Sequence, residues 1–317
     1  MEYRFLGQTG LQVSEFCLGT LPMGPLQSNI GVKEGGYLIR LALEQGINFV
    51  DTAQLYQTYP YIKAALAGYS GQVIINSKSS AENFQNMEKA LEEAFRALGR
   101  DDIEMFLLHA AREKPDVFAK RAGAWECLQE YKRKGYIKAI GIATHNVRTV
   151  ETAACLPEVD IIFPLINYKG LGILEGDKET MLAAIAQADN AGKGLYAMKA
   201  LAGGALLDEL RQAVDFTRRI PGISSVSIGV TSTAELLMDL KLFSGEKLCQ
   251  DELVTLKNKK KLKFMQFCVG CGACAAGCVN SAIAMVEGRP QVNTEKCVLC
   301  GYCTPLCPEF AIRLQNA

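Results

Sequence analysis

Short apolar runs alternate with amphipathic stretches from residue 13 to about residue 244. The apolar runs are typical of buried strands and predict eight of them, at 13–19, 47–51, 72–77, 103–108, 137–142, 160–166, 194–199 and 224–229. Each run is followed by apolar residues at helical spacing, which predict helices at about 33–46, 58–68, 80–98, 116–134, 146–156, 177–191, 205–219 and 232–243. In 80–98, Met87, Leu91 and Leu98 share one helical face, and Gly99 follows as a stop.

This alternation predicts βαβ units around a parallel sheet. Eight such units in about 245 residues match the size of an α/β fold of the (β/α)8, or TIM-barrel, type. A doubly wound sheet is the alternative. It is less favoured, because no Gly-x-Gly-x-x-Gly motif opens a helix after the first predicted strand.

The last fifty residues contain two copies of one cysteine motif. The spacing C-x2-C-x2-C-x3-C occurs at Cys268, Cys271, Cys274 and Cys278, and returns 29 residues later at Cys297, Cys300, Cys303 and Cys307. Bacterial ferredoxins use this run to hold two [4Fe–4S] clusters, and the fourth cysteine of each run ligates the other cluster. We therefore expect one cluster on Cys268, Cys271, Cys274 and Cys307, and a second on Cys297, Cys300, Cys303 and Cys278.

A zinc ribbon is the alternative for these cysteines, because C-x2-C also binds zinc. Two full quartets and a proline after Cys307 favour iron–sulfur clusters. The four other cysteines lack ligand spacing and are interpreted as buried or incidental thiols: Cys17, Cys127, Cys155 and Cys249.

The predicted domains are a barrel over residues 1–245, a linker over 246–263, and a small α+β domain resembling bacterial ferredoxins over 264–317. From Lys257 onward, eight Lys or Arg against three Asp or Glu give a charge of +5, and the preceding residues have −5. The five lysines at 257–263 predict either a solvated surface or a docking patch for an acidic electron carrier such as a ferredoxin.

Bulk composition narrows the class of protein. The 317 residues are 49% hydrophobic and contain no run of 18 apolar residues, so no membrane span is expected. The first residues lack the apolar region of a signal peptide, and the iron–sulfur spacing favours a reducing, oxygen-poor cytoplasm. The zero net charge gives no support for nucleic-acid binding.

Polar residues stand where the predicted strands end, and barrel chemistry occurs at the carboxyl ends of strands. Asp51 ends the second run and Tyr56 follows it, while Lys78 and His109 end the third and fourth. A lysine ammonium beside a tyrosine favours the phenolate and lowers its pKa, a carboxylate would hold the lysine, and a histidine could orient a carbonyl oxygen. The remaining strand ends give His145, Asn167 and Lys199, each interpreted as a substrate contact or a structural residue.

Four separated features resemble the aldo-keto reductase family: Gly46–Ala53, Tyr56, Asn76-Ser77-Lys78, and Met105–His109. The whole chain resembles the bacterial subgroup that has a C-terminal two-cluster ferredoxin domain. The resemblance implies a catalytic tetrad of Tyr56 as general acid, Lys78 and Asp51 tuning it, and His109 orienting a small carbonyl substrate.

The family usually uses NADPH, and this chain departs from its nucleotide pattern. Ala143-Thr144 replaces the common Ser-Asn, and Gly229–Thr233 contains no Arg or Lys for a 2′-phosphate. By resemblance, Glu235 and Asp239 meet the adenosine, Thr231 lies in the same loop, and Tyr196 or Met198 replaces the aromatic ring that stacks on nicotinamide.

Three hypotheses follow. The first is an NAD(P)H-dependent carbonyl reductase with an attached iron–sulfur module. In the second, a ferredoxin feeds electrons through the clusters to the substrate. The third is a non-enzymatic electron-transfer subunit.

Overall fold

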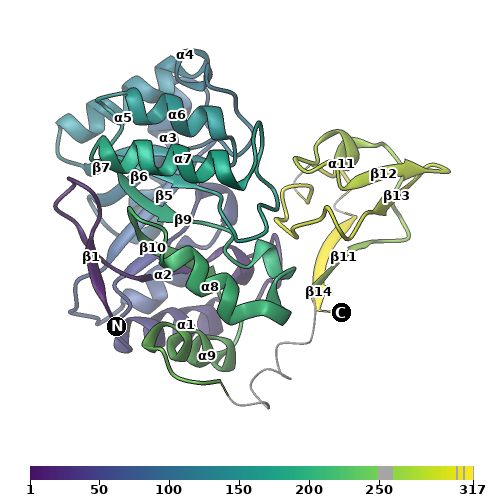
Figure 1. The fold of residues 1–317 in the computed structure, drawn as a ribbon, viewed down its shortest axis with the longest axis horizontal. Helices are drawn as coiled ribbons and strands as arrows, with labels where there is room; N and C mark the ends of the chain where they lie inside the picture. Colours follow the sequence, from purple (N-terminus) through teal and green to yellow (C-terminus); the bar gives the residue numbers. More distant parts are fainter. Residues whose placement is uncertain (249–259, 305, 310, 317) are drawn as a thin grey trace.

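The computed structural model describes residues 1–248, 260–304, 306–309 and 311–316 (Figure 1). Eight parallel strands form a closed barrel, which confirms the predicted fold class. In barrel order the strands are β10 (Ile223–Gly229), β3 (Phe16–Gly19), β4 (Phe49–Asp51), β5 (Ile74–Ser79), β6 (Ile103–His109), β7 (Ile137–Thr144), β8 (Ile161–Pro164) and β9 (Gly194–Ala197).

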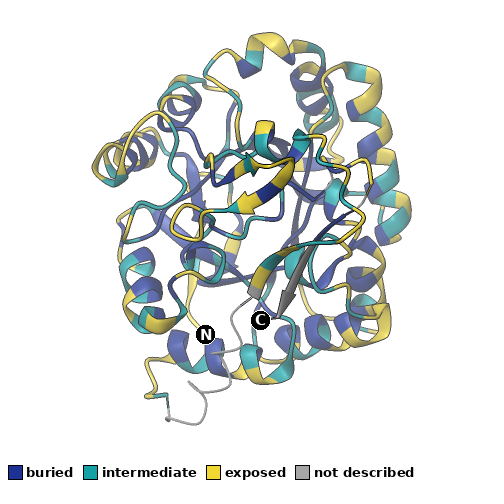
Figure 2. Ribbon diagram, turned by 90° about the vertical axis from the view of Figure 1, so that its right-hand side faces the viewer, coloured by how far each residue is buried: buried dark blue, intermediate teal, exposed yellow. Residues whose placement is uncertain are grey.

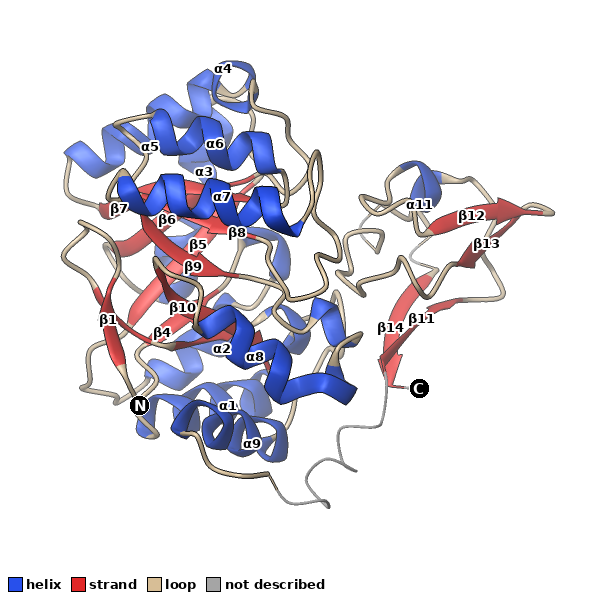
Figure 3. Ribbon diagram, viewed as in Figure 1, coloured by secondary structure: helices blue, strands red, loops and turns tan. Residues whose placement is uncertain are grey.

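Helices surround the barrel in Figure 3: α1 (Val32–Glu44), α2 (Tyr59–Leu66), α3 (Phe84–Leu98), α4 (Val117–Lys120), α5 (Ala122–Arg133), α6 (Val147–Cys155), α7 (Lys178–Asn190), α8 (Leu210–Arg218) and α9 (Thr233–Ser244). The helix predicted from residue 80 begins later, because the Asn83 side chain accepts from the Asn86 N–H and caps α3. The stretch at 116–134 forms two helices that meet at Arg121. Residues 205–209 precede α8 and include the 3-10 turn η4 (Leu207–Glu209).

The first apolar run also differs from its prediction, because it contributes to two strands. Its beginning lies in β2 (Gln12–Ser14), which pairs antiparallel with β1 (Tyr3–Phe5). The barrel strand β3 starts only at Phe16.

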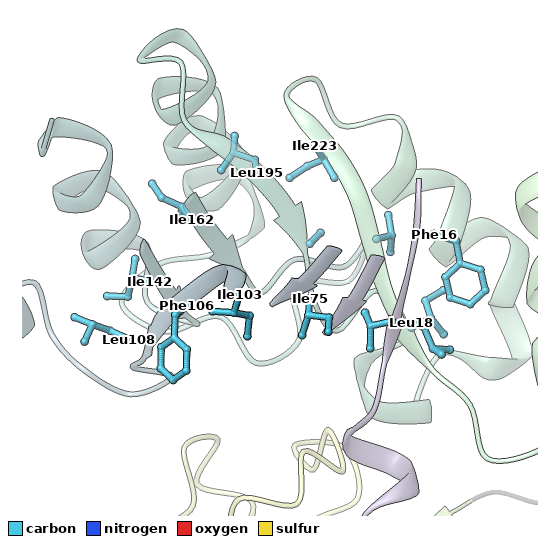
Figure 4. Close-up of a cluster of buried hydrophobic side chains, with 14 of the residues drawn as sticks. Phe16, Leu18, Ile75, Ile103, Phe106, Leu108, Ile142, Ile162, Leu195 and Ile223 are labelled. Carbon is cyan, nitrogen blue, oxygen red and sulfur yellow. The ribbon is translucent and has the colours of Figure 1, made fainter. Parts of the chain in front are cut away.

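Side chains of the barrel strands alternate between two apolar cores. Along β6, Met105 and Leu107 point into the barrel, while Phe106 and Leu108 pack outward under the helices. Figure 4 shows the outward set, with Phe106, Leu108, Ile142 and Ile162 among its members. The same alternation directs Asp51, Lys78 and His109, at or next to the ends of β4, β5 and β6, into the barrel.

The small domain contains two antiparallel strand pairs and one short helix. Strand β11 (Lys260–Phe264) pairs with β14 (Ile312–Asn316), and β12 (Ile283–Val286) pairs with β13 (Arg289–Val292). Helix α11 spans Ala273–Ala276. Strand β11 therefore includes the last four residues of the stretch that was predicted as a linker, of which residues 249–259 lie outside the described part.

The small domain lies at the barrel end that is formed by the carboxyl ends of the strands, in front of the barrel in Figure 2. Val298 is buried there with Ala202 and Leu206 of the loop after β9. An added Cβ at Gly203, whose φ is 69°, would overlap the Val298 carbonyl oxygen, so the two domains meet where only glycine fits. No helix in the described part of the chain has the length and apolar character needed to span a bilayer.

Candidate active site

A buried ion pair forms the base of the site. The Lys78 Nζ donates to both carboxylate oxygens of Asp51 at 2.8 Å and to the Thr52 carbonyl oxygen at 2.6 Å. These bonds engage the ammonium fully, and Lys78 is only 1% exposed. Burial lowers the pKa of Lys78, and the attraction of Asp51 opposes that effect.

Two residues to which the sequence analysis gave no role at Asp51 complete the environment of this carboxylate. The Asn76 side-chain amide donates to Oδ1 at 2.8 Å, and the Tyr196 hydroxyl donates to the same oxygen at 3.0 Å. Both follow from strand alternation, because Asn76 precedes Lys78 by two residues on β5 and Tyr196 points inward from β9. Tyr196 was predicted as a possible partner of nicotinamide, but it stacks against Phe163 instead, with the ring centroids 3.8 Å apart.

Tyr56 lies above this pair, at the end of the 3-10 helix η2 (Gln54–Tyr56). The Lys78 Nζ is 5.0 Å from the centroid of the Tyr56 ring. The predicted net lowering of the Tyr56 pKa is wrong. Burial raises that pKa well above its ordinary value, with Tyr302 and Asp51 adding to the effect, so the phenol is protonated at neutral pH.

His109 faces Tyr56 edge-on, with the ring centroids 5.8 Å apart. Burial, together with the positive charge of Lys78, lowers the His109 pKa well below its ordinary value, so the imidazole is neutral. Arg121, the residue between α4 and α5, donates to the backbone oxygens of His109 at 3.2 Å and Ser79 at 2.9 Å. The guanidinium therefore fixes the ends of two neighbouring strands.

The structure thus brings the four predicted tetrad side chains together, and it adds a residue from the small domain. The Tyr302 hydroxyl is 3.4 Å from His109 Nε2, and its ring stacks on His145 with centroids 5.7 Å apart. Tyr302 lies between Cys300 and Cys303 in sequence. Sequence reasoning missed it, because only the docking of the two domains reveals its neighbours.

A cavity of about 390 Å³ extends from the tetrad toward helix α9. Asp51 and Tyr56 line one end, and Leu299 and Tyr302 of the small domain also contribute to its wall. Its middle contains Phe163, Met198 and Lys199, and its far end contains Thr231, Glu235 and Asp239. Of the predicted ligand contacts, four therefore line this cavity: Lys199, Thr231, Glu235 and Asp239.

The far end of the cavity is acidic. The Thr231 N–H and hydroxyl both donate to Glu235 Oε2. The Asp239 carboxyl is buried, its Oδ1 has no hydrogen-bond partner among the described residues, and burial raises its pKa well above the ordinary value. Such an unpaired buried acceptor is suited to a ligand that supplies a donor.

Two other predicted contacts do not line this cavity in the described structure. The Asn167 side chain donates to the Leu171 carbonyl oxygen at 2.9 Å and accepts from the Leu171 N–H at 3.0 Å, so it holds the loop after β8. His145 is fully buried beneath Tyr302, and neither ring nitrogen has a partner among the described residues. Burial lowers its pKa to about 3.

The cysteines line two small cavities in the groupings that the sequence predicted. One cavity is lined by Cys268, Cys271, Cys274 and Cys307, and the other by Cys278, Cys297, Cys300 and Cys303. Among the described residues, no group of three His, Cys, Asp or Glu side chains is placed so that it could hold a single metal ion. Quartets that surround a space suit a polynuclear cluster better than one zinc ion.

Backbone N–H groups support this fit. Ala282 N–H donates to Cys278 Sγ and Ala311 N–H donates to Cys307 Sγ, both at 3.2 Å, at equivalent positions of the repeat. Hydrogen bonds to ligand sulfurs are among the factors that set cluster potentials. Of the other cysteines, Cys17 and Cys127 are buried and Cys155 is exposed, whereas Cys249 lies outside the described residues.

Known proteins match both parts of the chain. The profile of the "Aldo/keto reductase family" matches residues 16–268, and that of the "4Fe-4S dicluster domain" matches residues 267–311. Aldo-keto reductase YhdN of Bacillus subtilis is 26% identical over 53% of this chain and 54% of its own length. Methylglyoxal reductase DkgA of Yersinia pestis is 24% identical over 56% of this chain and 65% of its own length. The chain thus spans roughly half to two thirds of these relatives.

Other matches extend the comparison. The crystal structure of PA4992 from Pseudomonas aeruginosa, described as an aldo-keto reductase, superimposes with a TM-score of 0.67 and 26% identity, over 77% of this chain and 95% of that one. The cysteine-rich tail is 40% identical over 48 residues to a component of an ion-translocating oxidoreductase complex of Methanosarcina acetivorans, covering 15% of this chain and 18% of that protein.

Proposed function

The chain belongs to the aldo/keto reductase family and has a 4Fe-4S dicluster domain, and from this premise we propose that it reduces a small aldehyde or ketone with NAD(P)H. The observation that supports the proposal best is the cavity, which joins the phenol of Tyr56 to the acidic end at Glu235 and Asp239. Family membership makes the chain an oxidoreductase and disfavours the non-enzymatic hypothesis.

In this proposal Tyr56 donates the proton. Its raised pKa keeps the phenol protonated, and the nearby Lys78 ammonium stabilises the phenolate that forms when the proton leaves. His109 is neutral and donates from Nε2 to the substrate oxygen, where negative charge develops. Asp51 keeps Lys78 charged and in place, because it accepts two bonds from the ammonium.

A bound nicotinamide nucleotide would supply the hydride. Phe163 and Met198 would form the wall beside the nicotinamide, since both line the middle of the cavity, and Glu235 and Asp239 would meet the adenosine. Among the described residues that line the cavity, α9 contributes the two carboxyl groups of Glu235 and Asp239, and the one basic side chain is that of Lys199 after β9. The Glu235 carboxylate would repel a 2′-phosphate, whereas ribose hydroxyls could donate to the oxygens of Glu235 and Asp239. We therefore propose NADH as the tighter ligand.

Calorimetric titration of the purified protein with NADH and NADPH under anaerobic conditions tests the nucleotide. We expect NADH to bind at least tenfold more tightly and the difference to shrink in Glu235→Gln, which keeps a hydrogen-bond acceptor but loses the charge. Equal affinities in the wild type would contradict the acidic-end argument. If neither nucleotide binds, the nucleotide-dependent function is wrong.

Tyr56→Phe tests the proton donor. We expect kcat/KM for methylglyoxal, the substrate in the name of the DkgA relative, to fall about 10²- to 10⁴-fold, with nucleotide affinity unchanged. Tyr59→Phe is the matched control, because Tyr59 is buried nearby but its hydroxyl is 2.7 Å from Ser77 Oγ and does not line the cavity. A Tyr56→Phe variant within threefold of the wild type would refute the role.

A second candidate function is the reduction of the same substrate by electrons from a ferredoxin. It is favoured by Tyr302, which lines both the substrate cavity and the cavity of the Cys297–Cys303 motif. Lys261 and Lys263 are exposed on β11 and could meet an acidic carrier; Lys257 and Lys259 of the predicted patch lie outside the described residues. Full turnover with NADH or NADPH alone and none with reduced ferredoxin would rule this candidate out.

A further inference from the structure

We propose that Tyr302 is a further active-site residue, which the iron–sulfur domain contributes to the barrel, and that its hydroxyl holds the position of the substrate's carbonyl oxygen. A substrate binds by displacing this hydroxyl. The inference rests on the proposed carbonyl reduction at Tyr56. It adds a residue that controls the access of substrates to Tyr56 and the choice between small and bulky ones.

The geometry of the hydroxyl is the first argument. Tyr302 Oη lies 3.4 Å from His109 Nε2, and the Tyr302 phenol is close enough to the Tyr56 phenol to raise the pKa of Tyr56. These are the same two groups that would bind a carbonyl oxygen during reduction. Two oxygens cannot occupy one hydrogen-bonding position, so the substrate oxygen and the Tyr302 hydroxyl exclude each other.

The internal repeat is the second argument. Cys300-Gly301-Tyr302-Cys303 in the second motif corresponds to Cys271-Gly272-Ala273-Cys274 in the first, and both glycines have positive φ, 79° and 76°. The first motif has alanine at the equivalent position, so a cysteine loop of this shape does not require a tyrosine. Contacts with the barrel account for the large side chain instead.

Those contacts suggest what displacement would expose. The Tyr302 ring stacks on His145, and the Lys199 Nζ lies 6.0 Å from its centroid. The two nitrogens of His145 have no partner among the described residues. When the ring moves aside, His145 becomes accessible as a second polar contact for the substrate.

Displacement also links the substrate to the iron–sulfur domain. Tyr302 stands two residues after Cys300 and directly before Cys303, and it lines the cavity that these cysteines share with Cys278 and Cys297. A ligand that moves Tyr302 therefore alters the surroundings of the cluster that this quartet would hold. By thermodynamic reciprocity, the state of that cluster alters the affinity for the ligand.

Two substitutions at position 302 test the proposal in the full-length, anaerobically purified protein. Tyr302→Phe removes the hydroxyl and keeps the ring, so the KM for methylglyoxal should fall about threefold to tenfold, the equivalent of one net hydrogen bond, with kcat within twofold. Tyr302→Ala also removes the ring. It should lower the KM of the bulkier 4-nitrobenzaldehyde more than that of methylglyoxal.

A readout that does not depend on turnover is the electron paramagnetic resonance spectrum of the reduced clusters with and without acetamide, a carbonyl compound that is not reduced. We expect acetamide to change the spectrum of the wild type and of the matched control Ala273→Ser, in the equivalent loop. The change should be absent in Tyr302→Ala, whose loop then matches the first motif.

The outcomes separate this inference from the proposed function. A Tyr302→Phe variant whose kcat falls tenfold or whose KM rises overturns the inference, because the hydroxyl would then take part in catalysis or binding. An acetamide response in Tyr302→Ala equal to that of the wild type also overturns it. If the wild type reduces no carbonyl compound but acetamide still acts through Tyr302, the proposed function fails and the displaceable contact stands.

Discussion

The ion pair of Lys78 and Asp51 allows a quantitative test of how the site is held together. Asp51→Asn preserves the shape of the side chain but removes the charge that faces a fully buried ammonium. Breaking such a pair costs about 3–5 kcal/mol, because the remaining charge has neither water nor a counter-charge. For a barrel of this size each kcal/mol lowers Tm by about 2–4 °C, so we expect a loss of about 10 °C at pH 7.

The pH dependence of that loss follows from the direction of the Lys78 pKa. Burial already lowers this pKa, and removal of Asp51, which raises it, lowers it further. Between the Lys78 pKa of the folded variant and the higher Lys78 pKa of the unfolded chain, the native state binds fewer protons than the unfolded state. The free energy of unfolding therefore rises with pH in that interval. The deficit of Asp51→Asn should therefore be largest at pH 6 and smaller at pH 9.

Circular dichroism during anaerobic thermal unfolding measures both effects. The double variant Asp51→Asn/Lys78→Met, which has no buried charge at these positions, should recover all but about 1–2 kcal/mol of the loss. Glu209→Gln is the control, because its pair with Lys169 is also 2.8 Å long but exposed, and it should cost less than about 1 kcal/mol. A pH-independent loss below about 1 kcal/mol in Asp51→Asn would refute the reasoning. So would a double variant whose loss equals the sum of the losses in Asp51→Asn and Lys78→Met.

Three further predictions concern the proton donor, the domain contact and the clusters. Because the Tyr56 pKa is raised, kcat/KM for carbonyl reduction should stay constant to at least pH 9, and a decline beginning near pH 8 in the pH–rate profile would contradict this. Gly203→Ala should loosen the contact with Val298, so hydrogen exchange at residues 297–303 should become about tenfold faster while the barrel exchanges as before. Cys307→Ser should reduce the bound iron from about eight atoms to about four, as determined by metal analysis, whereas Cys155→Ser should leave it unchanged; an equal loss in both variants would contradict the ligand assignment.

The strand ends were predictable from sequence because the two-residue period of a strand fixes which side chains face inward. Asp51, Lys78 and His109 stand in register with the inward apolar residues of β4, β5 and β6, so recognising the strands was enough to bring them together. The cysteine quartets were predictable for a similar reason, since their spacing in the chain encodes the shape of the loop.

Features that depend on contacts distant in sequence were not predictable in this way. The break between α4 and α5 leaves no clear signal in the apolar pattern, because it occurs where Arg121 reaches backbone oxygens of β5 and β6. The direction of the Tyr56 pKa depends on how deeply the ring is buried and on the approach of Tyr302, and neither is encoded near residue 56. Asn167 was predicted to stand at a strand end, but β8 ends at Pro164, and the Asn167 amide binds the backbone of Leu171 in the loop that follows.

The contact at Val298 and Gly203 has a consequence for how the two domains associate. An apolar contact centred on a few side chains would bind only weakly between separate proteins, since association must first overcome the loss of translational and rotational freedom. One polypeptide joins both domains, so docking is intramolecular and proceeds at an effective concentration in the millimolar range. Covalent attachment therefore allows this apolar contact to keep Tyr302 over the barrel without the affinity that two separate proteins would need.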